Sequence, residues 1–177
     1  APCQLNAETP FQLLVATRLS AQCTDARVNL VTPALFAEFP DAQSMADADL
    51  DRVKELIKSC GLYKTKARDI VAMSIALRDN FNGAVPDTIE ELITLPGIGR
   101  KTANLIVGDI FNKPAVVVDT HCIRITGKLG FHNIKDAVKI ERLLRNLLPP
   151  EESNDFCHRI VFFGREVCSA RSPACEG

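Results

Sequence analysis

Apolar residues along the chain recur at intervals of three and four positions, the spacing that places one face of an α-helix against a core. Alternation of apolar and polar residues, which is typical of a half-buried strand, is missing over any useful length. The run Val116–Val118 is short, and we expect it to be an extended connector. The clearest helical segments are Val53–Cys60, Ala103–Ile110, Ile140–Leu147 and Phe156–Val167. The pattern predicts an all-α chain.

Residues that break helices divide this pattern into roughly nine short helices. We expect Pro10 to open the first helix and a loop containing Asn82-Gly83 to precede Thr88. The sequence Pro96-Gly97-Ile98-Gly99 separates two helices by only a few residues. Other helix ends are predicted near Pro40, Cys60-Gly61, Lys113-Pro114 and Pro149-Pro150.

The composition is that of a globular protein. With 177 residues, 46% hydrophobic and 24% charged, the chain has room for one domain or two small lobes. This composition excludes a disordered chain and a coiled coil. No apolar run approaches the roughly 20 residues of a membrane span, and the first residues do not follow a signal-peptide pattern. Seven cysteines without the regular spacing of a disulfide framework favour a reducing compartment.

Charge is unevenly distributed, although the net charge is −1 and the isoelectric point about 6.4. A neutral chain has no overall basic field that would indicate nucleic-acid binding, so such a function must rest on local features. One basic run comprises Arg52, Lys54, Lys58, Lys64, Lys66 and Arg68. A second basic group comprises Arg100, Lys101, Lys113, Arg124 and Lys128. Each could be a solvated helix face, but both flank one candidate site.

That candidate site is the segment from Leu95 to Thr102. A tight glycine turn that leads into a helix directs several unpaired backbone N–H groups to one point, where a phosphate can bind. The spacing of a P-loop is absent, and a lone Gly-x-Gly before a helix is usually only a turn. Lys101 changes this interpretation. A cation in the first turn opposes the helix dipole at a cost of ~0.3–1 kcal/mol, which points to a functional position.

Asp119 follows Lys101 by 18 residues, after an apolar stretch and before a helical pattern. This position is typical of an N-cap, and capping would hold the carboxylate in place. An ionised carboxylate beside an extruded sugar can stabilise positive charge at C1′ or accept a proton. Capping alone also explains the residue, and the two roles are compatible.

The residues from Leu95 to Asn104, followed by Val118-Asp119-Thr120-His121, resemble the helix-hairpin-helix and the catalytic aspartate of the endonuclease III family of DNA glycosylases. Leu19–Asp25 and Gly61-Leu62-Tyr63 extend the resemblance over essentially the whole chain.

The resemblance implies a base-excision repair enzyme with glycosylase and AP lyase activities that removes oxidised or ring-saturated pyrimidines. Lys101 would attack C1′ and form a Schiff base, Asp119 would assist, and β-elimination would nick the strand. Gln22 and Leu62 would fill the gap left by the flipped base, as an amide and an apolar wedge can. The partner would be double-stranded DNA with a damaged base or an abasic site. The remaining expected DNA-binding residues are Leu95, Pro96, Gly97, Ile98, Gly99, Arg100, Thr102 and His121.

The same resemblance implies a [4Fe–4S] cluster held by four cysteines near the C-terminus. Cys168 and Cys175 have the spacing of the first two, and the printed chain stops before a third. Because a cluster of this type needs four cysteines, we expect either a shortened chain or a member without its cluster, and we favour the former. A zinc site that adds Cys157 and His158 to this pair has poor ligand geometry. We expect the remaining thiols at Cys23, Cys60 and Cys122 to be small core residues within helices.

We therefore expect a two-lobed, all-α helix-hairpin-helix glycosylase fold that acts as a monomer in the cytoplasm or nucleoid, or in the nucleus or mitochondrion of a eukaryote. Residues 5–113 would form a helical barrel with the hairpin at about 88–111, and residues 114–177 would form an iron–sulfur-type lobe with an incomplete cluster end. Two alternatives stay open. One is a non-catalytic helix-hairpin-helix DNA-binding module, and the other is a monofunctional, adenine-type glycosylase that activates water with Asp119.

Overall fold

The structure is a computed structural model, and it describes residues 5–171 and 173–174. The chain divides into two compact units, the first over Gln4–Ile106 and the second over Val107–Gly177 together with Ala1–Cys3. Each unit is described below by itself. The division falls inside a helix, seven residues before the boundary that Lys113-Pro114 suggests.

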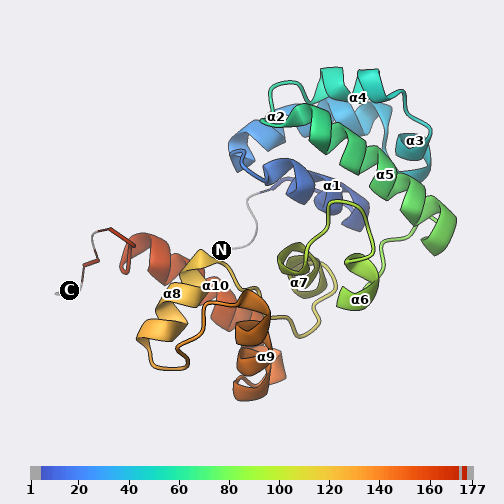
Figure 1. The fold of residues 1–177 in the computed structure, drawn as a ribbon. Coiled ribbons are helices and arrows are strands. Elements are labelled where there is room, and N and C mark those ends of the chain that lie inside the picture. The colour runs from blue at the N-terminus through green and yellow to red at the C-terminus, as the bar shows by residue number, and fades with distance from the viewer. Residues whose placement is uncertain (1–4, 172, 175–177) are drawn as a thin grey trace. The chain divides into compact units, whose positions relative to one another are not determined.

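In the described part of the first unit, six helices joined by loops lie wholly within the unit (Figure 1). Side chains of Thr9, Thr24, Asp41, Asp49 and Thr88 accept hydrogen bonds from the first turns of five of these helices, which is why each begins where it does. Pro10 occupies the first position of the first helix, as predicted. The helices are α1 (Pro10–Ser20), α2 (Asp25–Glu38), α3 (Ala42–Ala46), α4 (Leu50–Leu56), α5 (Tyr63–Phe81) and α6 (Ile89–Leu92).

The long helix α5 organises the core of the first unit. It packs against α1, α3 and α4. The apolar side chains between these helices are fully buried, so their burial supplies most of the unit's stabilisation. They include Leu14, Val15, Leu19, Val53, Ile70, Met73 and Leu77.

The second unit contains the end of α7 (Arg100–Asp109), a buried extended segment and three further helices. The extended segment Ala115–Val118 is buried and has no strand partner among the described residues, as expected for a connector. It leads into α8 (Thr120–Lys128), which packs against α10 (Ser153–Glu166). Along the chain, α9 (Ala137–Leu147) and the 3₁₀ turn η1 (Pro150–Glu152) come between α8 and α10.

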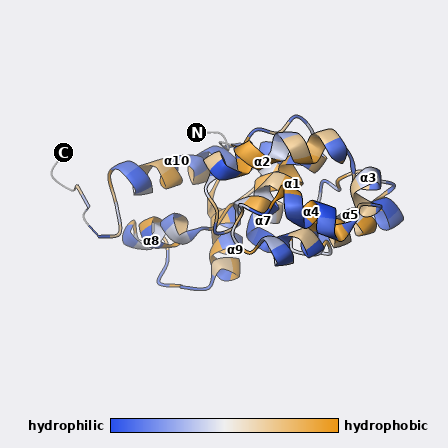
Figure 2. Ribbon diagram, turned by 90° about the horizontal axis from the view of Figure 1, so that it is seen from above, coloured by the Kyte–Doolittle hydropathy of each residue, from blue (hydrophilic) through white to orange (hydrophobic). Residues whose placement is uncertain are grey.

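The prediction of an all-α chain is confirmed over the described residues, whereas several details differ from expectation. Helix α4 ends at Leu56, so Ile57 and Cys60 are buried in the following turn and not in a helix. The stripe near the C-terminus is only partly buried, because Phe163 and Val167 are exposed. The helices carry both hydrophilic and hydrophobic residues (Figure 2), and no described helix is long and apolar enough to span a membrane.

Candidate DNA-binding and catalytic site

A tight turn joins α6 to α7 and forms the predicted helix-hairpin-helix. The amide of Ile98 donates to the carbonyl of Leu95 at 3.2 Å, and the amide of Ala103 donates to the carbonyl of Gly99 at 2.9 Å. The side chains of Leu95 and Ile98 are buried. The side chains of these two expected DNA-binding residues hold the turn against the core. Only their backbone is therefore available to a phosphate.

Gly97 is fixed by both its conformation and its neighbours. Its φ is +77°, a region that residues with a side chain rarely adopt. A Cβ atom at this position would lie 2.8 Å from Nε of Arg18 and 3.1 Å from Cβ of Asp69. These two residues form an ion pair in which Nε of Arg18 donates to Asp69 at 2.9 Å. The hairpin turn is thereby seated on a charged pair between α1 and α5.

The residues after the turn are open to solvent. A Cβ atom at Gly99 would meet no atom within 4 Å, so the space in front of this backbone is free for a ligand. Lys101 lies exposed in the first turn of α7, between the half-buried residues Arg100 and Thr102. Pro96 is half-buried. The open backbone at Gly99 and the exposed amine of Lys101 are therefore only two residues apart, as the motif predicts.

Gln22 and Leu62 lie on two adjoining loops of the first unit. Both residues are exposed, and both have a left-handed backbone, with φ of 54° and 57°. A Cβ atom at the neighbouring Gly61 would lie 3.3 Å from the carbonyl oxygen of Gln22, so the two loops touch. Leu62 is 60% exposed although it is a large apolar residue in a strained conformation. Strain and exposure together are the features expected of a residue kept for binding.

Asp119 is the N-cap of α8, as predicted. Its side chain accepts a hydrogen bond of 2.7 Å from the amide of Cys122, and its backbone is extended. The carboxylate is half-buried. This hydrogen bond holds one carboxylate oxygen at the start of the helix. Because the carboxylate is planar and rigid, the direction of the second oxygen is fixed as well.

His121 has a structural position in the second unit. The ring packs against α10, where a Cβ atom at Gly164 would lie 2.5 Å from its Nδ1. Its Nδ1 is also 3.2 Å from Nη2 of Arg124, which donates to the carbonyls of Gly164 and Cys168. The contacts of His121 and Arg124 therefore join α8 to α10, and they explain both residues without DNA.

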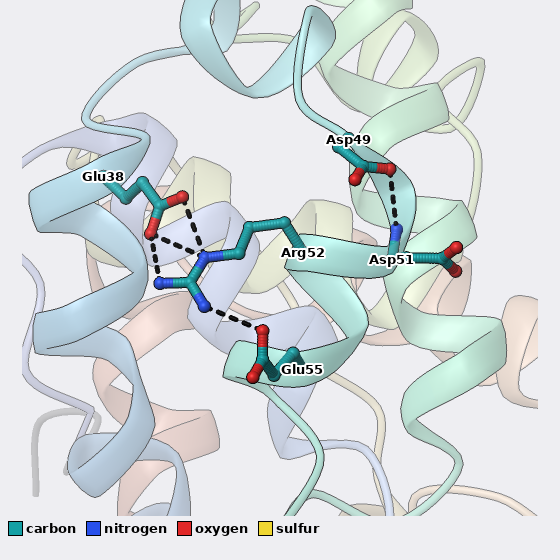
Figure 3. A network of polar contacts seen from close by, with 5 residues as sticks. All are labelled: Glu38, Asp49, Asp51, Arg52 and Glu55. Carbon is teal, nitrogen blue, oxygen red and sulfur yellow. Dashed lines mark hydrogen bonds and ion pairs between the residues drawn. The ribbon is translucent and has the colours of Figure 1, made fainter.

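The basic run from Arg52 to Arg68 is less available than its sequence indicates. Arg52 donates to Glu38 at 2.9–3.0 Å and to Glu55 at 2.8 Å (Figure 3), and Lys54 pairs with Asp51. Lys66 is completely buried, where burial lowers its pKa, so it cannot contact a phosphate. Besides Arg52, which is held by the two glutamates, the exposed members are Lys58, Lys64 and Arg68. The expected phosphate contacts are thus restricted to these three.

Two features of the first unit were missed by sequence reasoning. The ammonium of Lys66 donates to the carbonyl of Leu19 at 2.7 Å, which ties α5 to the end of α1. The pair Arg18–Asp69 supports Gly97 from below the hairpin. Both pairs join residues about fifty positions apart, and no local pattern indicates them. Lys66 does fall on the apolar face of its helix, with Ile70, and that placement was the available signal.

Among the described residues, the cysteines form two pairs, Cys23 with Cys60 and Cys122 with Cys157, and Cys168 lies apart from both. Cys60 and Cys122 are core residues as expected, but Cys23 is half-buried in the turn after α1 and not in a helix. Sγ of Cys168 accepts from Nζ of Lys128 at 3.9 Å, and Cys175 lies outside the described residues. The described residues hold no group of three or more metal-ligating side chains. They therefore do not supply the four thiolates that a [4Fe–4S] cluster requires.

Comparisons with known proteins extend over nearly the whole chain. Residues 15–150 match the family described as "HhH-GPD superfamily base excision DNA repair protein". The chain is 47% identical to endonuclease III of Synechocystis sp. over 176 residues, covering 99% of this chain and 80% of the relative. It is 38% identical to endonuclease III of Escherichia coli over 172 residues, covering 97% of this chain and 82% of the relative.

Solved structures give the same result. A trapped covalent intermediate of endonuclease III with DNA matches with a TM-score of 0.90 and 44% identity, covering 99% of this chain and 83% of that one. A non-covalent endonuclease III–DNA complex matches with a TM-score of 0.89, also at 44% identity, covering 99% and 82%. On these matches, the chain belongs to the endonuclease III family within the HhH-GPD superfamily.

Proposed function

We propose that Lys101 and Asp119 carry the chemistry of this base-excision repair DNA glycosylase, which also has AP lyase activity. The amine of Lys101 attacks C1′ of the damaged nucleotide, and the bond from C1′ to the base breaks as the base leaves with the bonding electrons and gains a proton. The amine then loses a proton, its lone pair forms an iminium with C1′ as the bond from C1′ to the ring oxygen O4′ breaks, and O4′ takes up a proton. Removal of a proton from C2′ breaks the C3′–O bond, and the strand is cut with phosphate as the leaving group.

The observation that carries this proposal is the exposed Lys101 in the first turn of α7, directly after a glycine turn with open space before it. A lysine in that position opposes the helix dipole and has no structural use there. The covalent endonuclease III–DNA intermediate among the similar structures shows that a relative of the same fold bonds to DNA. Asp119 supports the same reaction because its cap holds a carboxylate that can balance positive charge developing at C1′.

The remaining parts of the site bind DNA. The backbone from Leu95 to Gly99 receives a phosphate, while Gln22 and Leu62 enter the space left by the extruded nucleotide. The exposed, left-handed loops at these two residues support that role. Oxidised or ring-saturated pyrimidines are the proposed substrates, and the protein acts as a monomer in the compartment that holds the DNA. No step of this proposed reaction uses an iron–sulfur cluster.

Borohydride trapping tests the proposal. The protein is mixed with duplex DNA that carries one abasic site or one oxidised pyrimidine, and the imine is reduced in place. We expect a covalent protein–DNA band that disappears in Lys101→Ala and persists in Lys139→Ala, which removes another exposed lysine, on α9. DNA binding with no band in the wild type would contradict the lyase mechanism and indicate a binding module. Release of adenine from a mismatch without strand cleavage would indicate the monofunctional glycosylase.

A further inference from the structure

Two cysteines lie at the contact between the loops that carry Gln22 and Leu62. Cys23 directly follows Gln22, and Cys60 directly precedes Gly61 and Leu62. Both thiols are free, and the thiol of Cys23 lies close enough to act directly on that of Cys60. The backbones approach closely at the same place, because a Cβ atom at Gly61 would lie 3.3 Å from the carbonyl oxygen of Gln22.

The surroundings of this pair make its two thiols unequal. The ammonium of Lys66 is completely buried beside both sulfurs, where it donates to the carbonyl of Leu19 at 2.7 Å. Arg27 adds a second positive charge that acts on Cys60. These cations oppose the larger effect of burial, which raises the pKa of Cys60 and keeps its thiol neutral. Cys23 is half-buried and Cys60 is buried, so Cys23 is the sulfur that a small oxidant reaches first.

We propose that Cys23 and Cys60 form a site of reversible oxidation, at which a peroxide converts the two thiols into a disulfide. The thiolate of Cys23 attacks one oxygen of hydrogen peroxide, the O–O bond breaks, and a sulfenic acid and hydroxide form. The hydroxide takes up the proton that the Cys23 thiol had lost and becomes water. The sulfur of Cys60 then attacks that of Cys23, an S–S bond forms, and hydroxide leaves and takes the proton of Cys60 to give a second water. The two thiols lose two electrons and the peroxide gains them.

The disulfide links the two loops at positions next to Gln22 and Leu62. Bringing the two free sulfurs to the ~2.05 Å of a disulfide shifts both loops, and their left-handed residues must move with them. This consequence rests on the proposed function, in which these residues enter the DNA. Oxidation therefore weakens binding at an abasic site, by about tenfold if the change in binding free energy is ~1.4 kcal/mol, and reduction restores it.

Peptide mapping tests the site without reference to DNA. The reduced protein is treated with hydrogen peroxide, blocked with an alkylating reagent and digested without reductant. We expect a peptide that joins Cys23 to Cys60 and carries two hydrogen atoms fewer than the two separate peptides. Cys60→Ser removes this product, whereas Cys122→Ser, which alters the other buried thiol pair, leaves it unchanged. Oxidation of Cys23 to sulfinic or sulfonic acid alone, or its pairing with another cysteine, would overturn the proposal.

A binding assay then separates the two proposals. The affinity for a duplex with a stable abasic analogue is measured for the reduced, oxidised and re-reduced protein, and for Cys60→Ser after the same treatment. We expect oxidation to lower the affinity in the wild type only. Formation of the linked peptide with unchanged affinity would overturn the effect on DNA. A reduced protein that fails to bind DNA at all would contradict the proposed function and leave the thiol site standing.

Discussion

At the scale of single residues, this site depends on backbone conformations that only certain side chains tolerate. Gly97 needs its positive φ and the space against Arg18 and Asp69, whereas Gly99 needs only the space in front of it. The two glycines of one short motif therefore have different functions. The first positions the turn on the first unit, and the second leaves room for a ligand.

Replacement of each glycine by alanine distinguishes these functions. We expect Gly97→Ala to lower the free energy of unfolding by about 1–3 kcal/mol, because the added Cβ meets Arg18 and the backbone is strained. Gly99→Ala should change stability by less than about 0.5 kcal/mol but weaken DNA binding, since the methyl group enters open space at the expected phosphate site. Chemical denaturation and a DNA titration of both variants check this. Equal loss of stability in the two variants would contradict it.

The buried thiol of Cys60 predicts a dependence of stability on pH. Burial, with the nearby Cys23 and its hydrogen bond, raises the pKa of Cys60 to about 11 in the folded chain, above its ordinary value of 9.0. The folded state therefore keeps the neutral thiol, and unfolding allows it to ionise. The contribution to stability is complete below about pH 9 and is lost as the pH rises through about 11.

Cys60→Ala isolates this contribution, because the pKa of Lys66 is lowered by burial and its effect has the opposite sign. The difference in unfolding free energy between wild type and variant should shrink by up to about 2 kcal/mol between about pH 8 and about pH 11. Urea titrations in the presence of a reductant measure it. A difference that is constant over this range would show that Cys60 titrates alike in both states.

At the scale of elements, helix ends place the reactive groups. The amine of Lys101 is set by the start of α7, and the carboxylate of Asp119 is set by the start of α8. In the proposed reaction the carboxylate of Asp119 both caps α8 and balances positive charge, so the helix that it begins also determines where the charge lies. An N-cap can therefore be stabilising and reactive at once.

Two substitutions at Asp119 separate these roles. Asp119→Asn keeps an oxygen that can cap α8 but removes the charge, so we expect near-normal stability and a large loss of glycosylase turnover. Asp119→Ala should lose the turnover and also about 1 kcal/mol of stability. Thermal unfolding and single-turnover base release measure the two effects. Full turnover in Asp119→Asn would contradict a role for the charge.

At the scale of the whole molecule, a net charge of −1 leaves binding to local groups. Pairing removes Arg52 and Lys54 from the basic run, and burial removes Lys66. Lys64 is exposed at the start of α5, two residues after Leu62, and is thus the best-placed phosphate ligand of the run. Electrostatic binding to DNA should therefore come from a few phosphate contacts, and the loss of each one should lower the affinity measurably.

The salt dependence of DNA binding checks this distribution. We expect Lys64→Ala to reduce the slope of log K against log salt by about 1, because one phosphate contact is lost. Arg52→Ala should leave the slope unchanged, since Glu38 and Glu55 hold its guanidinium. Anisotropy titrations at several salt concentrations give both slopes. Equal changes in the two variants would contradict the assignment.

Local patterns were sufficient for much of the fold, and they single out the residues of the proposed site. Helical periodicity predicted an all-α chain, and Asp119 caps α8 where the sequence indicates, because caps depend on neighbouring residues only. The glycine turn and Lys101 were found from spacing for the same reason. Helix ends were less well predicted, and α4 stops before the apolar stripe that includes Cys60 does.

Only the tertiary structure decided which of these residues are available and what they touch. Lys66 belongs to a basic run in sequence, yet packing buries it against Leu19, and Arg52 is held by Glu38 from another helix. The strained loops of Gln22 and Leu62 meet with Cys23 and Cys60 between them, although these positions are about forty residues apart. The physical reason is that caps and periodicity are properties of neighbouring residues, whereas burial and long-range pairing exist only when distant segments pack together.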